Sequence, residues 1–276
     1  MRQFIRQLKD KLETNPPAVL TLGFFLIITI GSILLFLPFS SKNLNFTNFL
    51  DCVFISTSSV CVTGLSTINI TNEFNFFGKT VIMLLIQMGG LGFMTMATMV
   101  AMILGEKITL KDRLVIREQM GSTKLSGMVK LIRYVIFSTF LIEGLGAILL
   151  SFTFVPKFGL KGIFYSIFHS ISAFCNAGFD IIGNSMVDYV DNITVNLVIA
   201  FLIIFGGLGF TVYIDIYKKR RFKNLSLHSK VVISITAILL AVGTLAYFIL
   251  EHKNGSMEGL TLKGKILASF FMSASA

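Results

Sequence analysis

Two short polar segments of the chain carry residue types suited to binding through the backbone. They are Ser58–Leu65 (SSVCVTGL) and Ser172–Phe179 (SAFCNAGF), and their glycines lie 114 residues apart. Glycine reaches left-handed backbone conformations, which lets the carbonyl oxygens beside it turn toward one point. These residue types therefore favour a pore or a binding site formed by the main chain over acid–base or nucleophilic catalysis.

Composition and hydropathy indicate which elements must hold these segments. Hydrophobic residues form 54% of the chain and charged residues only 14%, with a mean hydropathy of +0.80. A soluble domain has about a quarter of its residues charged. Blocks with at most one charged residue, each long enough to cross a hydrocarbon core of ~30 Å, lie at 18–37, 80–104, 134–155, 193–214 and 231–250. The sequence predicts an all-α integral membrane protein with five spanning helices.

The stretches before the two polar segments predict short helices, at about 46–58 and 161–173. Helices of this length reach about 20 Å, which is too short to cross a membrane. Most Lys and Arg residues lie in 1–17, 105–133 and 215–230, and the positive-inside rule places all three stretches in the cytoplasm. An even number of crossings must separate them, so each short helix and its polar tail must enter and leave on one face. Non-helical backbone at that depth is tolerated where it lines a pore or a cavity.

The chain also repeats a second pattern, because GGLGF at Gly89–Phe93 recurs at Gly206–Phe210. Each repeat unit is expected to contain a spanning helix, a short helix, a polar segment and another spanning helix. The expected parts are an N-terminal cytoplasmic segment, a first unit, a connection, a second unit, a connection and the start of a third unit, at 1–17, 18–104, 105–130, 131–217, 218–230 and 231–276. The GGLGF glycines lie inside apolar spans, which favours close helix packing over a phosphate-binding loop.

Helix, pore helix, filter and helix is the architecture of potassium channels. The two polar segments resemble the first and second filters of the Trk/Ktr/HKT superfamily of potassium transporters. The whole chain resembles the membrane subunit of bacterial Ktr systems, with QMGGLGF at Gln87–Phe93 as a further shared signature. In that family one polypeptide carries four units around one pore. The resemblance implies two complete units here and the start of a third, with Ser273–Ala276 leading into its filter, so the chain is interpreted as a shortened product.

The resemblance implies potassium uptake across the cell membrane through a carbonyl-lined selectivity filter. Cys61 and Cys175 stand where Thr and Asn are expected, and Gly64 fits a preference for potassium over sodium. No cofactor is expected, potassium is the substrate, and a role of sodium as activator stays open. The residues implied to bind the ion, mainly through backbone carbonyls, are Cys61, Val62, Thr63, Gly64, Cys175, Asn176, Ala177 and Gly178.

The resemblance also implies partners and a location. Complete chains are expected to form a homodimer on a cytoplasmic ring of nucleotide-binding regulatory subunits, surrounded by membrane lipids. The implied location is the bacterial cell membrane, with several crossings and a cytoplasmic N-terminus. Nucleic acid is not an expected partner despite the net charge of +10, because the basic residues show no interleaved aromatic surface.

Two other functions remain open from the sequence. The chain could belong to a coupled secondary transporter of another cation, or it could be a non-conducting truncated fragment with an assembly role. An enzyme is not expected, because HExxH, GxSxG and clustered metal-ligand motifs do not occur.

Several ionisable residues need separate interpretation. Glu143 is the only charged residue inside the predicted spans, so it is a functional candidate, with a structural hydrogen bond as an equal alternative. His169, within a predicted pore helix, is expected to pack and not to bind a ligand. Asp180, Asp188 and Asp191 follow the second polar segment on the outer face. They are expected to be solvated loop acids, with attraction of cations toward the mouth as the alternative.

Overall fold

The computed structural model describes residues 16–92, 95–96, 98–99, 114, 128–252 and 257–276. In these residues the secondary structure is helical, apart from an isolated β-bridge between Ser41 and Phe74. The chain divides into two compact parts, Met1–Leu141 and Ile142–Ala276. The predicted N-terminal segment 1–17 and connection 105–130 lie almost entirely outside the described residues.

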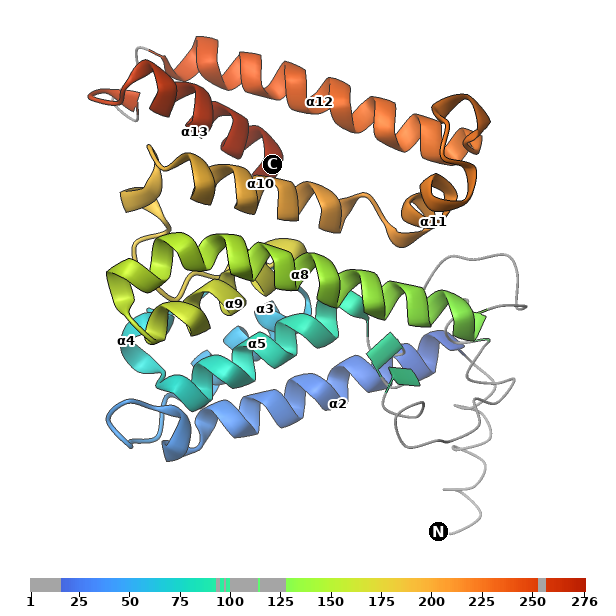
Figure 1. Cartoon of the computed structure of the whole chain (residues 1–276). Helices are drawn as coiled ribbons and strands as arrows, with labels where there is room; N and C mark the ends of the chain where they lie inside the picture. The colour runs from blue at the N-terminus through green and yellow to red at the C-terminus, as the bar shows by residue number, and fades with distance from the viewer. Residues whose placement is uncertain (1–15, 93–94, 97, 100–113, 115–127, 253–256) are drawn as a thin grey trace. The chain divides into compact units, whose positions relative to one another are not determined.

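The first part is built on one long apolar helix and two shorter ones (Figure 1). The long helix begins with two prolines, which suit a first helical turn because its N–H groups have no partner within the helix. It packs against both α3 and α5. The elements are α2 (Pro16–Phe36), η1 (Pro38–Ser40), α3 (Phe49–Val60), α4 (Ile70–Glu73) and α5 (Phe76–Leu91).

The second part begins inside a helix that crosses the boundary between the parts. In it, α9 and α13 each pack against α10, and α12 packs along α13. The elements are α8 (Met128–Phe158), α9 (Lys161–Phe174), η2 (Val187–Tyr189), α10 (Ile193–Gly207), α11 (Phe210–Lys219), η3 (Phe222–Asn224), α12 (Leu227–Glu251) and α13 (Leu262–Ser275).

Local sequence explains where most of these helices begin. A side-chain oxygen of Asn, Ser or Thr at the N-cap accepts a backbone N–H that the helix itself cannot pair. In the part of the chain that the structure describes, six helices have this cap, at Asn48, Asn69, Asn75, Asn192, Ser226 and Thr261.

Among the described residues, three helices are long and apolar enough to cross a membrane: Pro17–Phe36, Ile132–Phe158 and Leu227–Glu251. They match the predicted spans 18–37, 134–155 and 231–250. The predicted span 80–104 begins in α5 and continues into residues outside the described ones. The predicted short helices are α3 and α9, which end two residues and one residue later than expected, at Val60 and Phe174.

The prediction of one continuous helix over 193–214 was wrong. The structure has two helices there, α10 and α11, which are bent by 90° and could together form a fourth span. Gly209 lies at the break with φ +81°, a left-handed conformation that glycine adopts easily and that ends an α-helix. Gly92, its counterpart in the first GGLGF, has φ +82° at the end of α5. The GGLGF motif therefore marks the end of a helix and not the interior of a continuous one.

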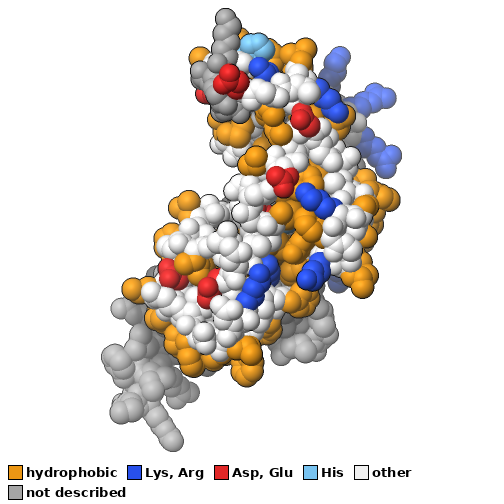
Figure 2. Space-filling view, turned by 90° about the vertical axis from the view of Figure 1, so that its left-hand side faces the viewer, with side chains coloured by type: hydrophobic (Ala, Val, Ile, Leu, Met, Phe, Trp, Pro, Cys, Tyr) orange, Lys and Arg blue, Asp and Glu red, His pale blue; other side chains and the backbone are white. Residues whose placement is uncertain are grey.

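Many large apolar side chains of the long helices are exposed, as expected for helices that contact lipid. In Figure 2, hydrophobic side chains (orange) gather mainly along the edges of the face. Among the largest exposed side chains are Phe25 on α2, Phe152 on α8 and Ile238 on α12. All three belong to helices long enough to span, so lipid is the solvent that suits these faces.

Candidate functional site

The first polar segment begins where α3 ends in a left-handed turn. The N–H of Thr63 donates to the carbonyl of Ser58 (2.8 Å), and the N–H of Val62 donates to the carbonyl of Ser59 (3.2 Å). Val62 is left-handed, with φ +50°, and Gly64 is left-handed again, with φ +79°. These two hydrogen bonds, five and three residues back, form a Schellman motif. The chain therefore leaves the helix abruptly at the segment predicted to bind an ion.

The second polar segment follows α9 with the same backbone path. The N–H of Ala177 donates to the carbonyl of Ser172 (2.8 Å), and the N–H of Asn176 donates to the carbonyl of Ala173 (3.0 Å). Asn176 has φ +57° and Gly178 has φ +70°. Every donor, acceptor and left-handed residue stands 114 positions after its counterpart in the first segment. The two segments are therefore conformational copies, although their sequences differ at several positions.

The left-handed residues of the two turns, Val62 and Asn176, differ in backbone strain. Schellman motifs usually place glycine there, and asparagine tolerates the conformation, as at Asn176. A β-branched residue at positive φ is a genuine outlier, and Val62 is such a residue. Strained backbone of this kind gathers at binding and catalytic sites, which supports a functional role for the first turn.

The backbone oxygens of both segments are available as ligands. Among the described residues, no hydrogen bond reaches the carbonyls of residues 61–64 or 175–178. No group of three His, Cys, Asp or Glu side chains in the described part of the chain could hold a metal ion. The oxygens lie at the C-terminal ends of α3 and α9, where the helix dipole is negative. Each segment therefore offers main-chain oxygens that accept no hydrogen bond from the described residues, as cation coordination through carbonyls would require.

The first glycine of each GGLGF motif lies against the end of a short helix. A Cβ on Gly89 would lie 2.1 Å from the carbonyl oxygen of Val60, and a Cβ on Gly206 would lie 1.7 Å from that of Phe174. Both distances are far below any real contact. The interpretation of these glycines as close-packing positions is confirmed, and the partner is the last helical residue before each polar segment.

A second repeated contact joins each long helix to the short helix after it. Between α2 and α3, the Ser56 hydroxyl donates to the carbonyl of Ile28 (2.9 Å), and a Cβ on Gly31 would lie 2.5 Å from that hydroxyl. The same contact recurs twice. Between α8 and α9, the Ser170 hydroxyl donates to the carbonyl of Glu143 (2.6 Å) beside Gly146. Between α12 and α13, the Ser273 hydroxyl donates to the carbonyl of Leu240 (3.0 Å) beside Gly243. Sequence reasoning missed it, although the aligned segments share the serine.

The two cysteines at equivalent positions have different surroundings. Cys61 is exposed, whereas Cys175 is buried. The thiol of Cys175 points toward the buried carboxylate of Glu143, with Sγ and Oε1 4.0 Å apart. The structure thus joins two residues that the sequence singled out separately. For Glu143, this contact favours the structural interpretation over that of an isolated intramembrane charge.

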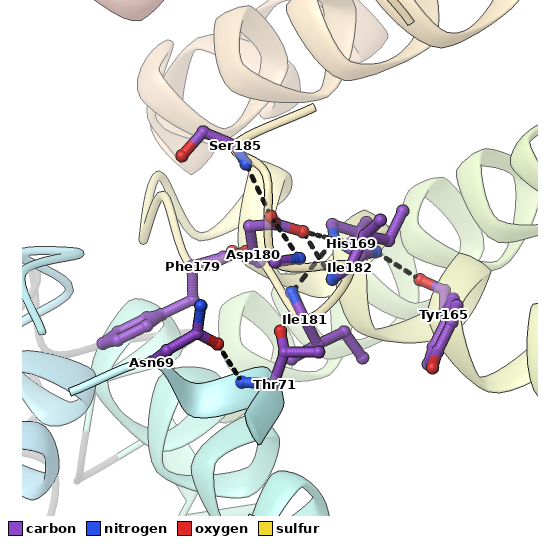
Figure 3. A network of polar contacts seen from close by, with 11 residues as sticks. Asn69, Thr71, Tyr165, His169, Phe179, Asp180, Ile181, Ile182 and Ser185 are labelled. Atoms are coloured by element: carbon purple, nitrogen blue, oxygen red, sulfur yellow. Dashed lines mark hydrogen bonds and ion pairs between the residues drawn. The ribbon is translucent and has the colours of Figure 1, made fainter. Parts of the chain in front are cut away.

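The expectation that Asp180 is a solvated loop acid was wrong. Its side chain is only 16% exposed, and its Oδ1 lies 3.0 Å from Nε2 of His169 (Figure 3). Burial by itself would raise the pKa of Asp180. The hydrogen bonds from His169 and from the N–H groups of Ile182 and Gly183 outweigh burial and hold that pKa well below its usual range. The residue is a structural anchor of the loop.

The other two loop acids also have partners. Asp188 is 57% exposed and forms an ion pair with Lys157 (3.7 Å), which agrees with a solvated acid. Asp191 accepts a hydrogen bond from the Thr261 hydroxyl at the start of α13 (3.0 Å). The loop after the second segment is therefore tied to its surroundings by each of its three acids.

Comparison with known proteins places the chain in a family. The TrkH family model, described as a cation transport protein, matches residues 12–275. The chain is 45% identical to the Ktr system potassium uptake protein B of Bacillus subtilis over 95% of its length, and 41% identical to the potassium/sodium uptake protein NtpJ of Enterococcus hirae over 98%. It is 37% identical over 97% of its length to the Ktr system potassium uptake protein B of Vibrio alginolyticus.

These matches cover the chain more fully than they cover the relatives, since the chain spans about 60% of the length of each. The family match extends over both polar segments and over all three pairs of a long helix with a short one. The chain belongs to the TrkH family of cation transport proteins.

Proposed function

We propose that the chain conducts potassium into the cell as part of the membrane subunit of a Trk/Ktr-type uptake system. The carbonyls of Cys61–Gly64 and of Cys175–Gly178 would supply two sides of its selectivity filter. The observation that carries this proposal is the shared backbone path of the two segments, with carbonyls that accept no hydrogen bond from the described residues. A pore lined by equivalent carbonyls requires repeated copies of one turn, and the two segments are such copies.

Helix lengths support a re-entrant arrangement of each segment. With 12 and 14 residues, α3 and α9 reach about 18 to 21 Å, against a hydrocarbon core of ~30 Å. We propose that both enter and leave on the outer face, with the N-terminus and the basic connections in the cytoplasm. Fusion reporters should then place Lys219 inside and Asn43 and Asp188 outside. A reporter at Lys219 on the outer side would exclude this topology.

The third pair of helices supports a pore with more than two repeats. The shared hydroxyl contact gives α13 the register of α3 and α9. Ser56 and Ser170 precede their polar segments, Cys61–Gly64 and Cys175–Gly178, by five to eight residues. In the same register, a third segment would begin five residues after Ser273. We propose that a third and a fourth repeat complete the ring of carbonyls.

The names of the relatives bear on ions and partners. Those from B. subtilis and V. alginolyticus are called Ktr system proteins, and the one from E. hirae a potassium/sodium uptake protein. They support potassium as substrate, sodium as a second ion to test as activator, and a system with further components. We propose a homodimer of complete chains on a nucleotide-binding regulatory ring in the cytoplasm.

Selective flux tests the function. The complete protein, reconstituted in lipid vesicles, should admit potassium in preference to sodium, and Gly64→Ser should lower that preference. Serine is disfavoured at φ +79° and would change the direction of the neighbouring carbonyls. Absence of potassium flux would contradict the proposal and leave the assembly role. Flux that saturates with a fixed sodium stoichiometry would favour a coupled transporter.

A further inference from the structure

A buried polar pair stands behind the second polar segment, on α9 and on the loop that follows. His169 is 4% exposed. Its Nε2 lies 3.0 Å from Oδ1 of Asp180, and its Nδ1 lies 2.7 Å from the carbonyl oxygen of Tyr165 (Figure 3). The backbone N–H of Ile181 also points at Nε2, at 3.4 Å. The buried imidazole therefore contacts the backbone of α9, the Asp180 carboxylate and the backbone of the loop at once.

Asp180 uses both carboxylate oxygens to organise the loop. Oδ1 accepts the N–H of Ile182 (2.7 Å), and Oδ2 accepts those of Gly183 and Ser185 (both 2.8 Å) (Figure 3). A carboxylate that accepts several N–H groups is held in its ionised form. The loop therefore folds around one carboxylate, and His169 is the buried side chain of α9 that contacts it.

This loop is continuous with the predicted filter. Asp180 follows Gly178 by two residues, and the residue between them is tied to the same helix, because the Ser172 hydroxyl donates to the carbonyl of Phe179 (2.9 Å). The outer end of the segment is thus attached to α9 at two successive residues. Movement of the Asp180 carboxylate would be passed to Gly178 through two peptide units.

The first segment has no counterpart of this pair. The positions equivalent to His169 and Asp180 are Ile55 and Ser66. Its outer chain is tied to α3 by an exposed hydrogen bond from Thr67 to Asp51 (2.6 Å). The rings of Phe154 and Phe168 each make an edge-to-face contact with the imidazole of His169, with ring centroids 5.7 Å apart in both pairs. In such surroundings, loss of either partner leaves a buried polar group without its hydrogen bond.

We propose that His169 and Asp180 form a positioning pair that sets the carbonyl geometry of the second filter and thereby its preference for potassium. This inference rests on the proposed function. Both residues act through the backbone of the segment, and neither touches the ion. The pair makes the second filter the one whose selectivity depends on a charged contact behind it.

The test compares potassium and sodium flux through the complete protein in vesicles, at equal protein content. Asp180→Asn keeps the shape of the side chain but removes its charge, and His169→Gln removes the imidazole that contacts it. Each should lower the potassium-to-sodium ratio roughly tenfold, and the double variant should be no worse than the more affected single one, because coupled residues are not additive. Asp188→Asn is the matched control, since it breaks an exposed ion pair in the same loop and should leave the ratio unchanged.

A second variant covers the case in which a single change prevents insertion. His169→Ile with Asp180→Ser copies the residues of the first segment and leaves no buried charge. It should insert and conduct with reduced selectivity. A wild-type ratio in this variant or in both single variants, or an equal loss in Asp188→Asn, would overturn the positioning role. Failure of the Ile/Ser variant to reach the membrane would also overturn it, because the pair would then be needed for folding. Wild-type protein without potassium flux would instead contradict the proposed function.

Discussion

The two polar segments have one backbone and two kinds of support. Their turns use hydrogen bonds between corresponding residues and the same left-handed positions. Around them, the first segment leaves Cys61 exposed and is tied by the exposed Thr67–Asp51 hydrogen bond. The second buries Cys175 and is held by the buried pair of His169 and Asp180.

This difference shows which features the carbonyl geometry requires, the main-chain turn, and which can vary, the side-chain contacts around it. The turn is a main-chain structure, so its side chains can change as long as each left-handed residue is tolerated. The supporting contacts are made by side chains, and each copy has its own. If the copies serve one pore, equal backbone geometry with unequal support gives them unequal sensitivity to mutation.

The largest effect should follow from a methyl group at the shared packing contact. Gly89→Ala and Gly206→Ala each place a Cβ against a backbone carbonyl, at 2.1 Å and 1.7 Å, so a whole helix end must shift. Overpacking costs about 1–3 kcal/mol and sometimes more, and we expect both variants to lose potassium uptake. Growth of a transport-deficient bacterium at low potassium measures this.

Gly144→Ala is the control for that experiment, because no packing neighbour lies within 4 Å of the position that its methyl group would take on α8. It should support normal growth. Gly206→Ala should be at least as damaging as Gly89→Ala, since its contact is shorter. Normal growth of either packing variant would show that the two segments are not held as described.

Thiol labelling should give the next largest difference between the segments. Cys61 is exposed and Cys175 is buried against Glu143, and a thiol reacts only where the reagent reaches it. A small impermeant reagent applied outside should modify Cys61 roughly tenfold faster or more, and bound potassium should slow both reactions. Mass spectrometry of Cys61→Thr and Cys175→Asn assigns the two rates. Faster reaction of Cys175 would reverse the comparison.

A glycine scan of the left-handed residues should show a smaller effect with a defined order. Val62 is β-branched at φ +50°, whereas Asn176 tolerates φ +57°. A left-handed residue other than glycine costs about 1–2 kcal/mol, and asparagine costs less. Val62→Gly should therefore raise the thermal midpoint of the purified protein relative to Asn176→Gly. The reverse order would mean that Val62 is stabilised by contacts that outweigh its strain.

The smallest expected effect is the loss of stability of the Asp180 loop at low pH. Because the folded-state pKa of Asp180 is lowered, its contribution to stability is present above the usual aspartate pKa of ~3.9 and is lost as pH falls below it. Asp180 should stay ionised between about pH 8 and 5, so it should cause no change in the hydrogen-exchange protection of residues 180–186 in that range. Below about pH 4 the protection should fall as the carboxylate is protonated. Asp180→Asn should lack the acid-dependent step. A step near neutral pH that disappears in this variant would contradict the assignment.

Much of this protein could be predicted from short stretches of sequence. The long apolar blocks identified α2, α8 and α12 because crossing a membrane is a property of length and composition. The aligned segments located the polar stretches after α3 and α9, and their glycines suggested left-handed backbone, as found at Gly64 and Gly178. The left-handed turns at Val62 and Asn176 were not predicted. The family followed from the same segments, and the match over 12–275 confirmed it.

Other features were decided by tertiary structure. The break at Gly209 depends on a backbone angle that an apolar run does not reveal. The burial of Asp180 and its contact with His169, like the pairing of Glu143 with Cys175, joins residues 11 and 32 positions apart. Hydrophobicity and period describe one element at a time, whereas a buried polar contact needs two elements to meet. For that reason the sequence located the predicted filters, and only the packed structure showed that each is supported differently.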